Sequence, residues 1–219
     1  GFYKYYSDYP VSVADGVSMA NKGAGFEVLG NEAIASVGKG KAYGLELLWQ
    51  QKLTDKFFGI FSYTYFYSTF SGLDPEVFRP SVWDSRHLAS FTTGYKLPKN
   101  WEVSSRFRYA DATPYVPTDL VQTTAFYPEI VLDYAALGSE KLASFNQLDV
   151  RFDKKWFYEK WSFNFFVEVQ NALGASNPQP PSYGLSRNAS GLPLQPRSLS
   201  LVPQESGTAI PSFGVVIDF

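Results

Sequence analysis

The sequence contains no cysteine, a single histidine and a single methionine. Without cysteine the chain cannot form disulfides, use a thiolate nucleophile or build a cysteine zinc site. A lone histidine, His87, excludes a multi-histidine metal centre. A basic excess is also missing, since 19 Lys and Arg face 21 Asp and Glu, which excludes a strongly electrostatic nucleic-acid binder. We therefore expect no metal, no other cofactor and no nucleic-acid partner.

Long apolar runs are absent as well. The longest uninterrupted run, Tyr134–Leu137, has four residues, far fewer than the ~20 that a membrane-spanning helix needs. The chain also starts at Gly1 rather than at Met, and no signal peptide precedes that residue. We therefore expect either a removed leader or a piece of a longer polypeptide, with enough length for one domain.

The sequence is rich in aromatic residues, which make up 18% of it. So many rings exclude a disordered chain, because they can bury enough area to offset chain entropy. They recur with a period of two, which is typical of strands that have one apolar and one polar face. This alternation predicts an all-β protein with about eight strands, at Phe2–Tyr9, Ala42–Leu53, Phe57–Phe70, His87–Leu97, Trp101–Tyr109, Asn146–Trp156, Trp161–Asn171 and Phe213–Phe219.

The connections between these strands alternate in length. Three are short, at Thr54–Lys56, Pro98–Asn100 and Phe157–Lys160, and four are long, at Pro10–Lys39, Ser71–Asp84, Ala112–Leu142 and Gly174–Ile210. Transmembrane β-barrels separate short periplasmic turns from long extracellular loops in this way. Four tryptophans lie near short connections, as in an aromatic girdle, although they could also belong to a sandwich core: Trp49, Trp101, Trp156 and Trp161.

Several segments resemble, in order, the barrel of TonB-dependent outer-membrane receptors, particularly those of Bacteroidetes-type bacteria. They are Gly1–Val11, a Gly-x-Glu strand opening in Gly40–Leu47, Leu53–Lys56, Ser62–Tyr65, a Trp-Asp-x-Arg-His signature at Trp83–His87, Gly94–Leu97, a Pro-Tyr-x-Pro element at Pro114–Pro117, Asn146–Arg151, Val169–Leu173 and the terminal Phe219. The resemblance covers nearly the whole chain.

The resemblance implies an antiparallel transmembrane β-barrel segment, with residues 1–219 forming the C-terminal part of a barrel of about 22 strands. It implies a bacterial outer-membrane receptor that imports a scarce ligand, such as a siderophore, cobalamin, a glycan or a peptide. The plug and the TonB box are not in this sequence. The implied partners are the plug and N-terminal strands of the same receptor, the TonB complex, the barrel assembly machinery, lipid and lipopolysaccharide, and an outer-membrane lipoprotein.

Two other architectures fit the alternation. The first is a self-contained eight-stranded outer-membrane barrel with a structural or lipid-modifying role, since small barrels of that size exist. The second is a soluble β-sandwich binding module, in which the polar faces would meet bulk water. Period two alone does not distinguish them.

The sequence contains no recognisable set of catalytic residues. His87 is the single histidine that could act as a general base, but no nucleophile elbow accompanies it. We therefore expect no enzyme, and in the family interpretation Trp83, Asp84, Arg86 and His87 anchor a loop to a strand.

Eight charged residues fall on the presumed lumen faces, where they form either a ladder of charge pairs or part of a ligand path: Glu46, Glu102, Arg106, Arg108, Asp149, Arg151, Asp153 and Glu168.

Two further groups of residues are candidates for binding. The loop aromatics could form a ligand surface or pack among loops: Tyr115, Phe126, Tyr127, Tyr134 and Tyr183. The last strand resembles a recognition signal for barrel assembly, read by β-augmentation through the alternating residues Phe213, Val215, Ile217 and Phe219.

Overall fold

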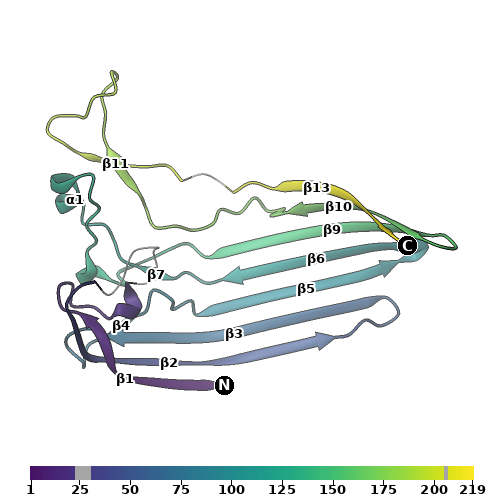
Figure 1. The fold of residues 1–219 in the computed structure, drawn as a ribbon, viewed down its shortest axis with the longest axis horizontal. Helices are drawn as coiled ribbons and strands as arrows, with labels where there is room; N and C mark the ends of the chain where they lie inside the picture. The colour runs from purple at the N-terminus through teal and green to yellow at the C-terminus, as the bar shows by residue number, and fades with distance from the viewer. Residues whose placement is uncertain (23–30, 205–206) are drawn as a thin grey trace.

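The computed structural model describes residues 1–22, 31–204 and 207–219. Eight long antiparallel strands follow one another in chain order across one curved sheet (Figure 1). They are β1 (Phe2–Ser12), β2 (Ile34–Gln51), β3 (Phe57–Ser71), β5 (His87–Leu97), β6 (Trp101–Ala110), β9 (Phe145–Phe157), β10 (Ser162–Gln170) and β13 (Ile210–Asp218). The predicted all-β, antiparallel architecture is therefore confirmed, as is the number of long strands.

The sheet is open. In the described part of the chain, β1 pairs with β2 alone and β13 pairs with β10 alone, so the first and last strands form the two edges. The structure does not show the closed eight-stranded barrel that was one alternative. A strand edge carries unpaired backbone N–H and C=O groups, which call for a partner strand in a membrane.

Strand boundaries differ from the prediction mainly at the long connections. β1 extends to Ser12 and β2 begins at Ile34, inside the predicted connection Pro10–Lys39. The reason is backbone pairing, which continues past the alternating segment with Pro10 opposite Ser36 and Val11 opposite Ala35. Residues 23–30 of that connection, and residues 205–206 of Gly174–Ile210, lie outside the described residues.

Short and long connections lie at opposite ends of the sheet, as predicted. The short turns are on the right of Figure 1 and the long loops on the left. The long loops carry β4 (Phe78–Pro80), which pairs with β3, β7 (Pro114–Tyr115), β8 (Glu140–Lys141), β11 (Tyr183–Leu185), β12 (Leu199–Leu201), α1 (Leu120–Phe126) and 3₁₀ helices at Met19–Asn21 and Tyr134–Ala136. A further 3₁₀ helix, Pro98–Asn100, forms the short turn between β5 and β6. No described helix has the length and apolarity to cross a membrane.

The register keeps apolar side chains together on one face of the sheet. A row of partners crosses five strands and consists of Trp49, Phe61, Phe91, Phe107 and Leu148. Another row consists of Phe152, Val167 and Phe213. Many side chains on this apolar face are exposed, and the examples on β2 are Leu45, which is 65% accessible, and Leu47, which is 56% accessible. Since no second sheet covers this face in the described residues, the structure does not show the soluble-sandwich arrangement.

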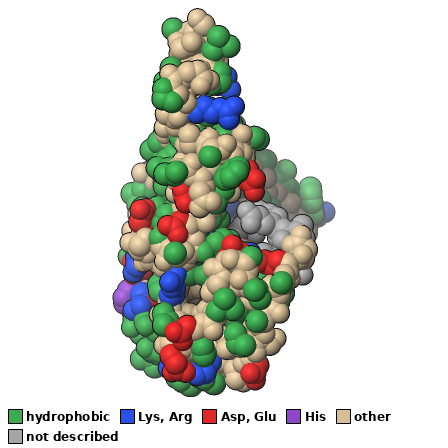
Figure 2. All heavy atoms as spheres, turned by 90° about the vertical axis from the view of Figure 1, so that its left-hand side faces the viewer, with side chains coloured by type: hydrophobic (Ala, Val, Ile, Leu, Met, Phe, Trp, Pro, Cys, Tyr) green, Lys and Arg blue, Asp and Glu red, His purple; other side chains and the backbone are tan. Residues whose placement is uncertain are grey.

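The buried apolar core is small and lies at the loop end. Val17, Val82 and Leu137 come from three different loops and pack together, with Val116 and Tyr134 against them. Figure 2 looks onto this end, where apolar and charged side chains are mixed and the β11–β12 hairpin projects beyond the rest. The loops thus stabilise one another, while the apolar face of the long sheet remains exposed.

Arginine on the apolar face should impair membrane assembly. Tyr65 lies in the middle of β3, so Tyr65→Arg should cost about 2–4 kcal/mol at mid-depth. Phe165 lies opposite Lys154, close to the turn end, so Phe165→Arg should cost less, because the penalty falls toward the interface. Thr64→Arg, on the polar face opposite Glu46, is the matched control. Outer-membrane yield measures the effect, and normal assembly of Tyr65→Arg would contradict the assignment of the faces.

Candidate functional site

The polar face gathers most of the predicted lumen charges on three neighbouring strands. Glu102, Arg106 and Arg108 alternate along β6, and Asp149, Arg151 and Asp153 alternate along β9. The register places Arg106 opposite Asp149, and Arg151 opposite both Ser104 and Glu168 of β10. Since side chains at period two share a face, the alternation of each strand builds one continuous charged surface.

Asp149 is the centre of one cluster of charges on this surface, which includes Arg106 and Arg108. Its carboxylate is almost fully buried and accepts hydrogen bonds from the Arg106 guanidinium (3.1 Å), the Gln147 amide (2.8 Å) and the backbone N–H of Asn171 (2.9 Å). Arg108 approaches it to 3.7 Å. These contacts link β6, β9 and the end of β10. The alternation did not single out Gln147 or Asn171, because neither is charged.

Arg151 and Asp153 form the second pair, within β9. Two N–H groups of Arg151 donate to the Asp153 carboxylate at 2.7 and 2.8 Å, and the Asn164 amide donates to it at 2.8 Å. The Arg151 guanidinium also lies 3.8 Å from the Phe166 ring centre. Glu46 stands apart, opposite Thr64 on β2 and β3, so the structure does not bring it to the ladder.

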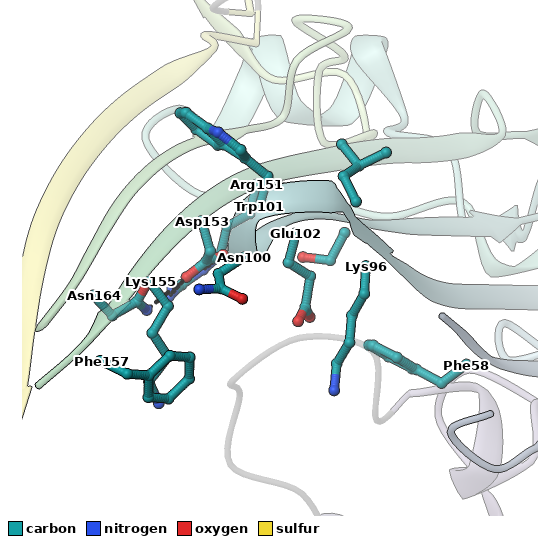
Figure 3. A pocket seen from close by; sticks show the side chains of 12 residues that line it. Phe58, Lys96, Asn100, Trp101, Glu102, Arg151, Asp153, Lys155, Phe157 and Asn164 are labelled. Carbon is teal, nitrogen blue, oxygen red and sulfur yellow. Dashed lines mark hydrogen bonds and ion pairs between the residues drawn. The ribbon is translucent and has the colours of Figure 1, made fainter. Parts of the chain in front are cut away.

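A hollow of 540 Å³ opens on this face toward the short-turn end. In Figure 3, Lys96 of β5 and Glu102 of β6 project into it, with Phe58 on one side and Lys155 on the other. Lys96 and Glu102 are cross-strand neighbours, yet neither forms an ion pair within the described residues. The hollow therefore presents charges of both signs to whatever occupies the space above the sheet.

His87, the candidate general base, does not belong to this surface. In the described part of the chain, no three His, Cys, Asp or Glu side chains come together to hold a metal ion. His87 lies on the apolar face, where its Nδ1 is 2.7 Å from the Tyr63 hydroxyl. It thus lies on the opposite face from the carboxylates of the ladder, and within the described ranges no serine hydroxyl is hydrogen-bonded to it.

Asp84 anchors the loop that precedes β5. Its carboxylate is 1% exposed and accepts from the Ser68 backbone N–H (3.0 Å) and from Arg86 Nε (2.9 Å). The Arg86 guanidinium in turn lies 4.1 Å from the Tyr67 ring centre on β3. Trp83 projects outward, and its indole N–H donates to the Ala20 carbonyl. Three of the four motif residues thus tie the loop to β3 or to a neighbouring loop.

The five loop aromatics do not form a single surface. Tyr115 and Tyr183 line the same hollow, whereas Tyr134 packs against the loop core of Val17, Val82 and Leu137. Phe126 ends α1 and is 60% exposed, and Tyr127 follows it. Neither of these two lines the hollow of Tyr115.

The hollow of Tyr115 and Tyr183 has a volume of 400 Å³. Its wall is mostly apolar and contains Val116, Pro117, Leu120, Ile130, Leu132, Pro180 and Pro181. The Tyr115 hydroxyl donates a hydrogen bond to the carboxylate of Glu140, its partner across β7 and β8. Burial and this hydrogen bond raise the pKa of Tyr115 to about 12, so the phenol stays neutral. Sequence reasoning missed Glu140, because a pairing across 25 positions leaves no local signal.

The last strand presents its alternating residues outward along an open edge. Phe213, Val215 and Ile217 are 80%, 57% and 47% exposed, and Phe219 is fully exposed. An edge strand of this kind can add to another strand by backbone hydrogen bonds. Its role in assembly stays a prediction, which the folding rate after deletion of Phe219 would test.

A family model described as "TonB dependent receptor-like, beta-barrel" matches residues 1–172, which span β1 to β10. No curated protein and no solved structure matches the chain.

Removing the Asp84 carboxylate should destabilise the loop anchor. Asp84→Ala leaves the Ser68 N–H and the Arg86 guanidinium without their acceptor, which costs about 1–3 kcal/mol. Glu129→Ala, at an exposed loop position, is the control and should change little. The midpoint of thermal unfolding in detergent measures both, and equal midpoints for the two variants would refute the anchoring role.

Proposed function

Because the chain belongs to the TonB-dependent receptor-like β-barrel family, we propose that it forms the C-terminal barrel wall and extracellular loops of a receptor that imports a scarce ligand. The family consists of transporters and not of enzymes, which confirms the prediction that the chain has no catalytic role. Family membership also implies an outer-membrane location, a plug domain and coupling to TonB.

The observation that carries this proposal is the open, two-faced sheet. Its apolar face is exposed over eight strands, and both edges offer unpaired backbone. In water such a face would be an aggregation hazard, and in a bilayer an open edge costs several kcal/mol per unpaired group. Lipid on one face and further strands of a larger barrel at both edges remove both costs. The remaining strands and the plug would come from the same receptor.

The polar face is suited to contact with the plug. Its ion pairs are balanced, with three Arg facing two Asp and Glu168, so it presents no single-sign field. Lys96 and Glu102, which lack ion-pair partners among the described residues, remain available to charged groups of an occupant. We assign the hollow of Lys96 and Glu102 to the plug rather than to the ligand, because it lies toward the short-turn end, away from the loops where a ligand arrives.

The hollow of Tyr115 and Tyr183 is our candidate for ligand contact. It lies among the long loops and combines an apolar wall with a carboxylate and two phenols, the composition of small-ligand pockets. An iron chelate, cobalamin, a glycan or a peptide could each present an apolar or ring surface with hydrogen-bonding groups. The barrel assembly machinery, lipopolysaccharide and an outer-membrane lipoprotein complete the set of proposed partners.

The size and location of the native protein test the first part of the proposal. Outer membranes, fully denatured and probed with an antibody to residues 174–204, should show a band several times larger than 24.5 kDa. The larger band is expected because eight strands do not close here. A band at 24.5 kDa with no co-purifying partner that supplies strands would overturn it.

Receptor-dependent growth tests the ligand site. Cells are grown on a panel of iron chelates, cobalamin, glycans and peptides as the limiting nutrient, with and without the receptor. On any nutrient whose use requires the receptor, Tyr183→Ala and Glu140→Gln should each lower uptake, because they remove a ring and a charge from the hollow. Phe126→Ala, an exposed ring outside it, is the matched control. Uptake that falls for Phe126→Ala alone would contradict the site.

A further inference from the structure

One cation interrupts the apolar face near the short-turn end. Lys154 of β9 lies opposite Trp101 on β6 and opposite Phe165 on β10, both of which point to the apolar face. Its ammonium nitrogen is 5.4 Å from the Trp101 ring centre and 5.3 Å from that of Trp156. In Figure 3, Trp101 points to the side of the sheet opposite Glu102 and the hollow. The lysine is therefore held between two indole rings on the outer face.

This charge has no carboxylate partner. The Lys154 ammonium donates to the backbone carbonyl of Lys99, and among the described residues no Asp or Glu oxygen forms an ion pair with it. An ammonium has three donors, so others remain for a ligand. The neighbouring Lys155 differs, since it lies on the polar face and pairs with Asp218 at 3.5 Å. The outer face thus carries an uncompensated positive charge at this point.

The surroundings of Lys154 change from polar to apolar along the strands. The half-exposed rings of Trp101 (45%), directly opposite, and Trp156 (39%), nearer the turn, flank it, and indoles favour the boundary between lipid and water. Away from the turn lie Phe152 and Val167, which are 50% and 40% exposed. A cation at the boundary, with apolar side chains beyond it, matches the shape of an amphiphile that has an anionic head and acyl tails.

We propose that Trp101, Lys154 and Trp156 form a binding site for the phosphate head of an anionic phospholipid in the periplasmic leaflet, with an acyl chain along Phe152 and Val167. Charge complementarity selects the anionic head, and the apolar row selects a lipid over a free phosphate. This inference rests on the proposed function, because it requires the apolar face to meet the bilayer.

The test compares two adjacent lysines that lie on opposite faces. The native receptor, purified from outer membranes in detergent, is titrated with phosphatidylglycerol or phosphatidylcholine and examined by native mass spectrometry. Lys154→Gln should weaken phosphatidylglycerol binding about fivefold, which corresponds to ~1 kcal/mol for one basic residue at a membrane surface. Lys155→Gln makes the same charge change on the polar face and should leave binding unchanged. Lys154→Arg should retain it.

Other outcomes would overturn the site. Equal weakening by Lys154→Gln and Lys155→Gln would mean that net charge alone attracts the lipid. Binding unchanged in Lys154→Gln would also reject it, as would equal affinity of the native receptor for the two lipids. Competition by glycerol phosphate as strong as by the lipid would assign the site to a free phosphate. Heat-modifiable migration in gels checks separately that each variant is folded. Absence of the native protein from the outer membrane would refute the proposed function, whereas the lipid-binding outcomes above bear on this site alone.

Discussion

Continuous antiparallel pairing over seven strand junctions is the constraint on which the rest of this structure depends. Each strand has a side-chain period of two, so a slip of one residue at any junction would move a whole strand of aromatic side chains to the polar face. The register avoids such slips from β2 to β13: apolar rows remain aligned across β2, β3, β5, β6 and β9. The irregularities in β1 occur at Tyr6–Pro10, toward the loop end.

The same pairing explains why the core is so small. Few apolar side chains are buried among the described residues, and most of these lie at the loop end: Val11, Val17, Ala42, Phe70, Val82, Pro114 and Leu137. A sheet of this kind gains little from burial within its own chain. In the receptor that we propose, its apolar face gains from lipid instead, and its polar face gains from the Arg–Asp contacts around Asp149 and Asp153. One feature, the alternation, thus supplies the membrane contact and the lining of the barrel together.

The two ends of the sheet have different chemistry because their connections differ in length. The short turns bring Trp49, Trp101 and Trp156 to one end, where Lys154 lies between two of them. The long loops at the other end have enough chain to form their own core and a hollow. Asp84 and Arg86 connect that loop layer to β3, which makes the loop end a folded part of the receptor rather than a set of free connections.

The sequence by itself determined the strands, their faces and the separation of short from long connections, because these follow from local periodicity. All eight predicted strands are present, and Arg106 and Asp149 lie on the predicted face. The tertiary structure decided what local patterns do not encode. Pairing with β1 extends β2 back to Ile34. The folding of the loops places Tyr134 against the loop core and Tyr115 in the hollow, and the pairing of β7 with β8 brings Glu140 to Tyr115. These contacts join residues far apart in the chain, and their positions depend on how the loops pack.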